Sequence, residues 1–216
     1  MTTSVRWLDR LAHDLRGPLT PLLTAAQLLR IGQVNGEHQQ ELFAVIERQT
    51  RQLVRMIDEL GDWTRISDDR LLNQREHCEP SLLLDYARTK SGPAGIGAKV
   101  DDQAGDAAVH GDPVRLTQML RILVEFANPR GDAPVSIMLK TIGERMRIDV
   151  RGAGVPTDSA QAAMLLEEPQ AEPYDGGLGL GLLIARAIAE AHDGTLTTPG
   201  GDGEFVLRCE LPLQLG

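Results

Sequence analysis

The sequence predicts an α+β protein, in which an antiparallel helical hairpin precedes a mixed β-sheet with helices covering one face. Two observations carry this prediction. The first third of the chain repeats apolar residues in alternating steps of four and three, which is the spacing of a helical seam. The rest is punctuated by glycine and proline turns that separate short apolar runs. With 216 residues, the chain is long enough for two small domains of unequal size.

The hairpin is expected to occupy residues 1–70. Its first seam follows Leu8, Ala12, Leu15, Leu19, Leu22, Ala26 and Leu29, and its second follows Leu42, Ile46, Gln49, Leu53, Met56, Leu60 and Trp63. A break that begins and ends with glycine separates the seams, so the two helices are expected to turn there. A narrow apolar seam leaves one hairpin incompletely buried in water, whereas two copies can pack as a dimeric four-helix bundle. We therefore expect a homodimer through this region.

A second domain is expected at residues 80–216, after a linker at 71–79. The patterns predict helices at 80–91, 112–127 and 179–192, and strands at 98–101, 134–141, 145–151, 194–198 and 204–211. Because the strands are interleaved with helices, the expected architecture is an α/β sandwich.

The composition excludes several classes of protein. Lys plus Arg number 22 against 31 Asp plus Glu, and the formal net charge of -9 opposes contact with a nucleic-acid backbone. The only cysteines, Cys78 and Cys209, lie far apart in the sequence and predict neither a disulfide framework nor a zinc cluster. No stretch approaches the roughly 18 apolar residues of a membrane helix. We expect a cytoplasmic protein with no membrane insertion and no resident metal.

The stretch LAHDLRGPLTPLL carries the chemistry of the hairpin. The seam directs Ala12 and Leu15 toward the bundle. His13 and Asp14 are then rotated by roughly 100° and 200° from Ala12 and are expected to face water. An exposed neutral imidazole is a nucleophile toward phosphorus, and a neighbouring carboxylate can orient the ring and accept its proton. Pro18 removes one helical hydrogen bond and is expected to bend the helix about one turn beyond His13.

The stretch from His13 to Leu19 resembles the phosphoacceptor box of two-component histidine kinases, in which His is followed by an acid, then Arg, then Pro-Leu. The matching residues are His13, Asp14, Leu15, Arg16, Pro18 and Leu19. Residues 1–70 are similar to the dimerization and phosphoacceptor hairpin of that family, and 80–216 are similar to its ATP-binding domain. The resemblance implies that His13 exchanges a phosphoryl group with the aspartate of a response-regulator receiver domain. Family members that dephosphorylate their regulator carry Thr or Asn three residues after the acid. Gly17 stands there and predicts poor phosphatase activity.

The stretch GLGLGL is expected to open a helix, where glycines let the backbone approach a phosphate and free amides favour its charge. Gly177, Gly179 and Gly181 correspond to the second glycine box of the family. In VRGAGVP, Gly152 and Gly154 match its first glycine box. The resemblance implies that these five glycines bind nucleotide if the site is retained. The alternative is a helix that packs closely on the sheet through small residues.

Three polar residues of that family's ATP site are replaced here. Phe126 stands in place of an Asn that helps hold Mg²⁺, Pro129 in place of a basic residue, and Val150 in place of the acid that accepts the adenine amino group. Asp149 is expected on the opposite face of its strand, and Glu125 is the least unfavourable substitute metal ligand. Each unpaired buried polar group costs roughly 1 to 3 kcal/mol, so ATP binding is expected to weaken by about two to four orders of magnitude.

Three functions remain open from the sequence. In the first, the protein is a histidine phosphotransferase that needs no cofactor and is charged by other kinases, such as an upstream hybrid kinase. In the second, Glu125 or main-chain groups rescue the binding of ATP and Mg²⁺, and the protein is a true histidine autokinase. In the third, the chain is a noncatalytic interaction module that never carries phosphate. Whether the chain is an enzyme depends on this choice, and either phosphorelay version requires His13 and Asp14.

Overall fold

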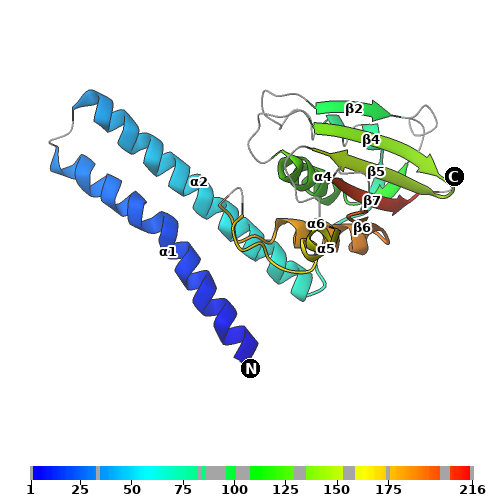
Figure 1. Ribbon diagram of the computed structural model, residues 1–216, viewed down its shortest axis with the longest axis horizontal. Coiled ribbons are helices and arrows are strands. Elements are labelled where there is room, and N and C mark those ends of the chain that lie inside the picture. Colours follow the sequence, from blue (N-terminus) through cyan, green and yellow to red (C-terminus); the bar gives the residue numbers. More distant parts are fainter. Residues whose placement is uncertain are drawn as a thin grey trace.

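A long helical hairpin leads into an α/β domain in the computed structural model (Figure 1). The structure describes residues 2–32, 35–81, 84–85, 96–100, 108–128, 135–152, 159–173, 176–199 and 205–214. Helix α1 spans Thr2–Ile31 and helix α2 spans Gly36–Ser67, and the two run antiparallel (Figure 1). The predicted hairpin is therefore confirmed.

The ends of the hairpin helices follow local rules. Gly32 has a φ of +71°, a left-handed conformation that glycine adopts without a Cβ clash, and it ends α1. The side chain of Asn35 accepts a hydrogen bond from the backbone N–H of His38 at 3.1 Å and so caps the start of α2. Glycine and asparagine thus place the turn where the seam breaks.

The seam of α1 is only partly covered within one chain. Of the predicted seam positions, Leu15, Leu22 and Leu29 are half-buried, whereas Ala12, Leu19 and Ala26 are exposed, and the buried Ala25 is not a seam position. The side chain of Leu8 lies outside the described residues. Pro18 and Pro21 both lie inside α1, which changes direction along its length in Figure 1. A bent helix cannot keep every seam position against one straight partner.

The second domain is built on a five-stranded mixed sheet. Its elements are β1 (Glu76–Cys78), β2 (Ile96–Val100), β3 (Val109–Gly111), α4 (Pro113–Ala127), β4 (Val135–Ile142), β5 (Arg145–Arg151), α5 (Ser159–Met164), α6 (Gly181–Ala191), β6 (Thr195–Thr197) and β7 (Val206–Pro212). The sheet order is β2-β4-β5-β7-β6, with only the β2–β4 pair parallel, and β1 pairs with β3 in a separate ribbon. The mixed sheet was predicted, whereas the ribbon and α5 were not.

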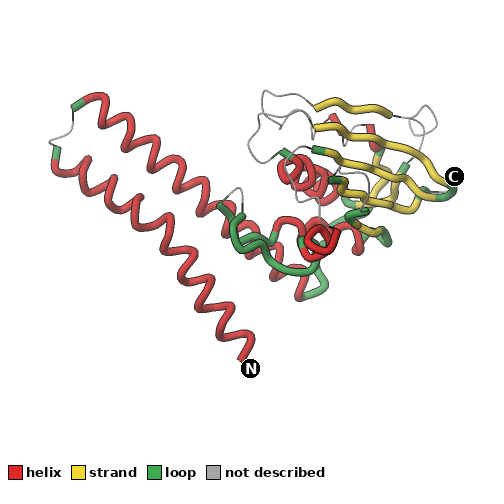
Figure 2. Tube along the Cα trace, viewed as in Figure 1, coloured by secondary structure: helices red, strands yellow, loops and turns green. Residues whose placement is uncertain are grey.

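The helices α4 and α6 form one layer against this sheet. Helix α4 contacts β5, and α6 contacts β6, β7 and also α2, so the helical layer lies between the sheet and the hairpin (Figure 2). Of the helix predicted at 80–91, the structure describes residues 80–81 and 84–85, which are helical, and the rest lies outside the described residues. The predicted helix at 179–192 begins at Gly181.

The core lies between the sheet and these two helices. Alternate residues of β4 and β5 point into it, including Ile137, Leu139, Ile148 and Val150, as the two-residue period of a strand requires. Cys209 is fully buried in the same core, and burial raises the pKa of its thiol to about 12. None of the helices in the described part of the chain has an apolar run capable of crossing a lipid bilayer.

Candidate functional site

His13 projects from α1 into water, as the seam predicts. Its side chain is 87% exposed, and its Nδ1 lies 3.2 Å from Oδ1 of Asp14. When Nδ1 carries the proton and donates a hydrogen bond to Asp14, Nε2 is left with the lone pair that can attack phosphorus. The arrangement suits a nucleophilic imidazole that is oriented by a carboxylate.

Asp14 is less exposed than expected, because part of the second domain lies against this face of α1. Its side chain is 32% exposed, and Nε of Arg10 lies 3.6 Å from its Oδ2. Arg10 also donates from Nη2 to the backbone oxygen of Gln170 at 3.2 Å. Arg10 therefore connects the His13–Asp14 pair to the second domain. The sequence carries a signal for the Arg10–Asp14 ion pair that was missed, since these two residues have the i, i+4 spacing of helical ion pairs.

The predicted glycine box gathers at the start of α6. Gly179 has a φ of +77°, and its oxygen accepts a hydrogen bond from the backbone N–H of Gln170 at 3.0 Å. Gly177 is buried, and Gly181 is the first residue of α6. A Cβ on Gly179 would clash with the backbone of Gln170, so glycine is required there by both conformation and space.

Helix α2 supplies two side chains to the glycine turn, the segment 176–181 that leads into α6. The backbone N–H of Leu178 donates to Oε2 of Glu59 at 2.5 Å, and Nε2 of Gln52 donates to the oxygen of Gly176 at 2.9 Å. Sequence reasoning missed both residues, because nothing in the pattern of α2 indicates which of its polar residues meets the second domain. The turn is therefore held by the hairpin as well as by its own domain.

Of the first glycine box, only Gly152 is described. It follows β5 and packs against the end of α4, where a Cβ would overlap the carbonyl group of Ala127. Gly154 and Pro129 lie outside the described residues. The close approach of β5 to α4 accounts for glycine at position 152 by packing alone.

The residues that replace the family's polar groups are built into the structure of the domain. Val150 is fully buried in the core, and the buried ring of Phe126 packs on Phe205 with 6.0 Å between ring centroids. Asp149 points to the other face of the sheet, where its two oxygens accept hydrogen bonds from Arg208 at 2.7 and 2.9 Å. Hydrogen bonding to Asp149 is the main cause of the raised pKa of Arg208. Asp149 is thus paired with Arg208 on the face of the sheet opposite to Val150, as the strand period predicts.

A small cavity lies beside the glycine turn. The cavity that Phe126, Gly179 and Gly181 line measures about 10 Å³, close to the volume that one water molecule needs. Among the described residues, no three His, Cys, Asp or Glu side chains gather closely enough to hold a metal ion.

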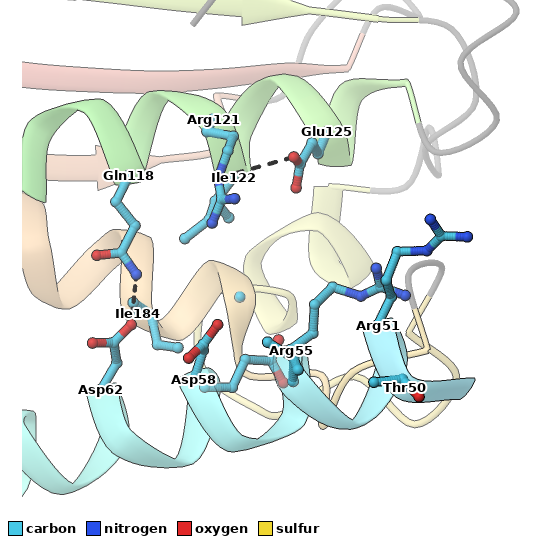
Figure 3. Close-up of a pocket in the computed structure, with 13 residues that line it drawn as sticks. Thr50, Arg51, Arg55, Asp58, Asp62, Gln118, Arg121, Ile122, Glu125 and Ile184 are labelled. Carbon is cyan, nitrogen blue, oxygen red and sulfur yellow. Dashed lines mark hydrogen bonds and ion pairs between the residues drawn. The ribbon is translucent and has the colours of Figure 1, made fainter. Parts of the chain in front are cut away.

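A larger cleft of about 670 Å³ separates α2 from α4 and α6 (Figure 3). Glu125 and Arg121 line it from α4, with Nε of Arg121 3.9 Å from Oε1 of Glu125, and Arg51 and Asp58 line it from α2. Glu125, the substitute metal ligand considered from the sequence, thus faces this cleft and lies beside a cation.

A buried polar cluster closes one end of the cleft. Nη1 of Arg115 donates to Oδ1 of Asp62 at 2.7 Å, and Nε2 of Gln118 donates to Oδ2 of the same carboxylate at 2.5 Å. Nε of Arg115 also donates to the backbone oxygen of Leu71 at 2.9 Å. Asp62 and Arg115 are 5% and 7% exposed, so a buried ion pair joins α2 to α4. The sequence carries no signal for this pairing.

The hairpin, its exposed histidine and the helix-covered sheet with a glycine turn define a protein of the histidine kinase type. Two family models agree with this class: the His Kinase A (phospho-acceptor) domain matches residues 4–69, and the Histidine kinase-, DNA gyrase B-, and HSP90-like ATPase matches residues 111–215. The chain belongs to the histidine kinase family.

Curated relatives align over nearly the whole chain. The chain is 27% identical to the sensory histidine kinase/phosphatase NtrB of Rhodobacter capsulatus, over 98% of this chain and 62% of that protein. It is 28% identical to the sensor protein TorS of Escherichia coli, over 97% of this chain and 24% of that protein. The chain thus spans less than two thirds of the length of these relatives.

Solved structures share the fold. The histidine kinase AdeS of Acinetobacter baumannii superposes with a TM-score of 0.71 at 18% identity, covering 94% of this chain and 98% of that one. The histidine kinase ThkA, solved in complex with the response regulator protein TrrA, gives a TM-score of 0.72 at 19% identity, covering 97% of this chain and 61% of that one. The predicted fold is therefore confirmed over both domains.

Proposed function

We propose that the chain is a phosphorelay protein in which His13 accepts a phosphoryl group and exchanges it with the aspartate of a receiver domain. The observation that carries the proposal is the 87% exposed imidazole, with Asp14 at Nδ1, on a hairpin that matches the phosphoacceptor domain. Nε2 attacks the phosphorus of a phosphoaspartate, the new P–N bond forms as the P–O bond breaks, and the aspartate leaves as a carboxylate. Asp14 stabilises the positive charge that develops on the ring.

We also propose that two copies pair through the hairpin. Most of the large apolar side chains that are exposed in the described part of the chain lie on α1 or α2, namely Leu19, Leu23, Leu28, Ile31, Phe43, Val54 and Ile57. Exposed apolar residues that gather on one element favour burial against a partner. A second copy supplies a matching surface, because a two-fold interface places the same patch on both chains.

The replaced polar groups support a phosphotransferase with weak ATP binding. Val150 and Phe126 lie in the core, the cavity beside the glycine turn is about the size of one water molecule, and Glu59 contacts the turn itself. Phosphotransfer between His13 and a receiver needs none of these features, because it depends on positioning the imidazole and the phosphoaspartate.

The active autokinase is a second candidate, and the relatives favour it. The two proteins compared above carry the names of a histidine kinase and a sensor protein. The glycines of the second box are retained in the sequence, and Gly179 keeps a left-handed conformation that only glycine adopts freely. In this version His13 receives its phosphoryl group from ATP.

Labelling decides between these functions. The purified chain is incubated with radiolabelled ATP and Mg²⁺, and separately with a panel of phosphorylated receiver domains. Label from ATP supports the autokinase, and label only from a receiver supports the phosphotransferase. The His13→Gln variant should lose all label, whereas His110→Gln, which changes an exposed histidine on β3, should keep it. An unlabelled wild-type chain under both conditions would reject the proposal in favour of a noncatalytic interaction module.

A further inference from the structure

Two side chains of helix α2 contact the glycine turn from the same side. Gln52 and Glu59 are seven residues apart, which is about two helical turns, so both project from the same face of α2. One side chain donates to the oxygen of Gly176 at 2.9 Å, and the other accepts from the backbone N–H of Leu178 at 2.5 Å. The two contacts bracket the turn that leads into α6.

The carboxylate of Glu59 takes the place that an anion would occupy at this turn. A Cβ added to Gly177 would lie 2.8 and 2.9 Å from the two carboxylate oxygens, so they fill the space that the missing side chain leaves. Helix α6 begins after Leu180, which provides no side-chain cap. The free N–H groups at a helix start favour negative charge, and here Glu59 supplies it from another domain.

We propose that Glu59 is an internal anion that closes the glycine turn to phosphate-bearing ligands while the second domain is docked on α2. The backbone N–H of Leu178 cannot donate fully to Glu59 and to a phosphate oxygen at once. A phosphate ligand must therefore displace Glu59, and binding of that ligand weakens the contact between α2 and the turn. The coupling is reciprocal, because a ligand that weakens docking is itself weakened by docking. This inference rests on the proposed function only in assigning the turn to the ATPase-like domain.

The docked arrangement does not depend on Glu59 alone. Met56 is buried on the same side of α2, and the buried pair of Asp62 and Arg115 joins α2 to α4. Removal of the Glu59 side chain should therefore open the turn while these contacts hold the domains together. This separation makes Glu59 a residue that can be tested in the full chain.

Inorganic pyrophosphate is the probe, because it tests the turn without the adenine contacts that Val150 and Phe126 replace. Its affinity is measured by isothermal titration calorimetry for the wild-type chain of 216 residues and for Glu59→Ala, Glu59→Gln and Glu47→Ala. We expect Glu59→Ala to bind at least about tenfold more tightly than the wild type, which corresponds to about 1.4 kcal/mol. Glu59→Gln should fall between them, since it keeps an acceptor but loses the charge. The control removes an exposed carboxylate of α2 that lies 3.6 Å from Arg51 and should match the wild type.

Two results would overturn the inference. One is equal pyrophosphate affinity in the wild type and Glu59→Ala, and the other is no binding by any of the four proteins. Thermal unfolding checks that each variant is folded, and Glu59→Gln decides the question if Glu59→Ala is not. Because this test measures anion binding and the labelling of His13 measures phosphotransfer, either proposal can fail while the other stands.

Discussion

Removal of one partner of the buried pair between Asp62 and Arg115 should destabilise the protein strongly. The side chains are 7% and 9% exposed, and 2.7 Å separates Oδ1 of Asp62 from Nη1 of Arg115. Asp62→Ala leaves the guanidinium with Gln118 and the oxygen of Leu71 but no carboxylate. Breaking a buried ion pair in this way costs about 3 to 5 kcal/mol, against at most about 1 kcal/mol for an exposed pair.

Urea unfolding, followed by tryptophan fluorescence and circular dichroism, measures this free energy. Asp58→Ala is the matched control, because it removes an exposed carboxylate one helical turn earlier on α2 and should change the free energy of unfolding by less than about 0.5 kcal/mol. The double variant Asp62→Ala with Arg115→Met should lose less stability than the sum of the single variants. A cost below about 1 kcal/mol for Asp62→Ala would refute the assignment of this pair as a buried link between α2 and α4.

Three further predictions follow from buried groups of the second domain. Burial lowers the pKa of His192, and its neutral ring accepts a hydrogen bond from the backbone N–H of Asp112 at 2.9 Å. The contribution of His192 to the free energy of unfolding is therefore complete above the ordinary histidine pKa of about 6.5 and is lost as pH falls below that value. Urea midpoints of the wild type should therefore drop between about pH 6.5 and pH 5, with a smaller slope in His192→Gln; equal slopes would contradict this. Asp112→Ala removes the cap of α4, where Oδ1 accepts from the N–H groups of Val114 and Arg115, and should cost about 0.5 to 2 kcal/mol in urea unfolding, whereas an unchanged midpoint would argue against the cap. Cys209, with its pKa raised to about 12 by burial, should react with iodoacetamide only after unfolding, and rapid alkylation of the native protein, read by mass spectrometry, would show that the thiol is accessible.

Local patterns predicted the elements that local interactions form. The alternating steps of four and three placed both hairpin helices, and the break at Gly32 marked their turn. The two-residue period placed β4 and β5 to within a residue and set Asp149 on the face away from the core. These features were predictable because helix and strand periods express which side of one segment is buried, which neighbouring residues already encode.

The candidate site was predictable only where its residues carry a motif. His13 and Asp14 adjoin in the sequence, and their geometry follows from one helix. The seam positions Ala12, Leu19 and Ala26 of α1 are exposed within one chain, and the apolar spacing does not say whether the covering surface belongs to the same chain or to another. The homodimer and the roles of the glycines remain predictions.

The sequence by itself determined the hairpin helices, the two helices that cover the sheet, the strands of the sheet, the exposed histidine and the glycine turn, because each of these segments is encoded by residues close together along the chain. Only the tertiary structure decided that Glu59 meets Leu178 across 119 positions and that Asp62 meets Arg115 across 53. Many acidic residues lie on α2, and which of them meets the second domain depends on how the hairpin and that domain pack together. Such docking is set by packing over the whole interface, for which a single chain carries no periodic signal.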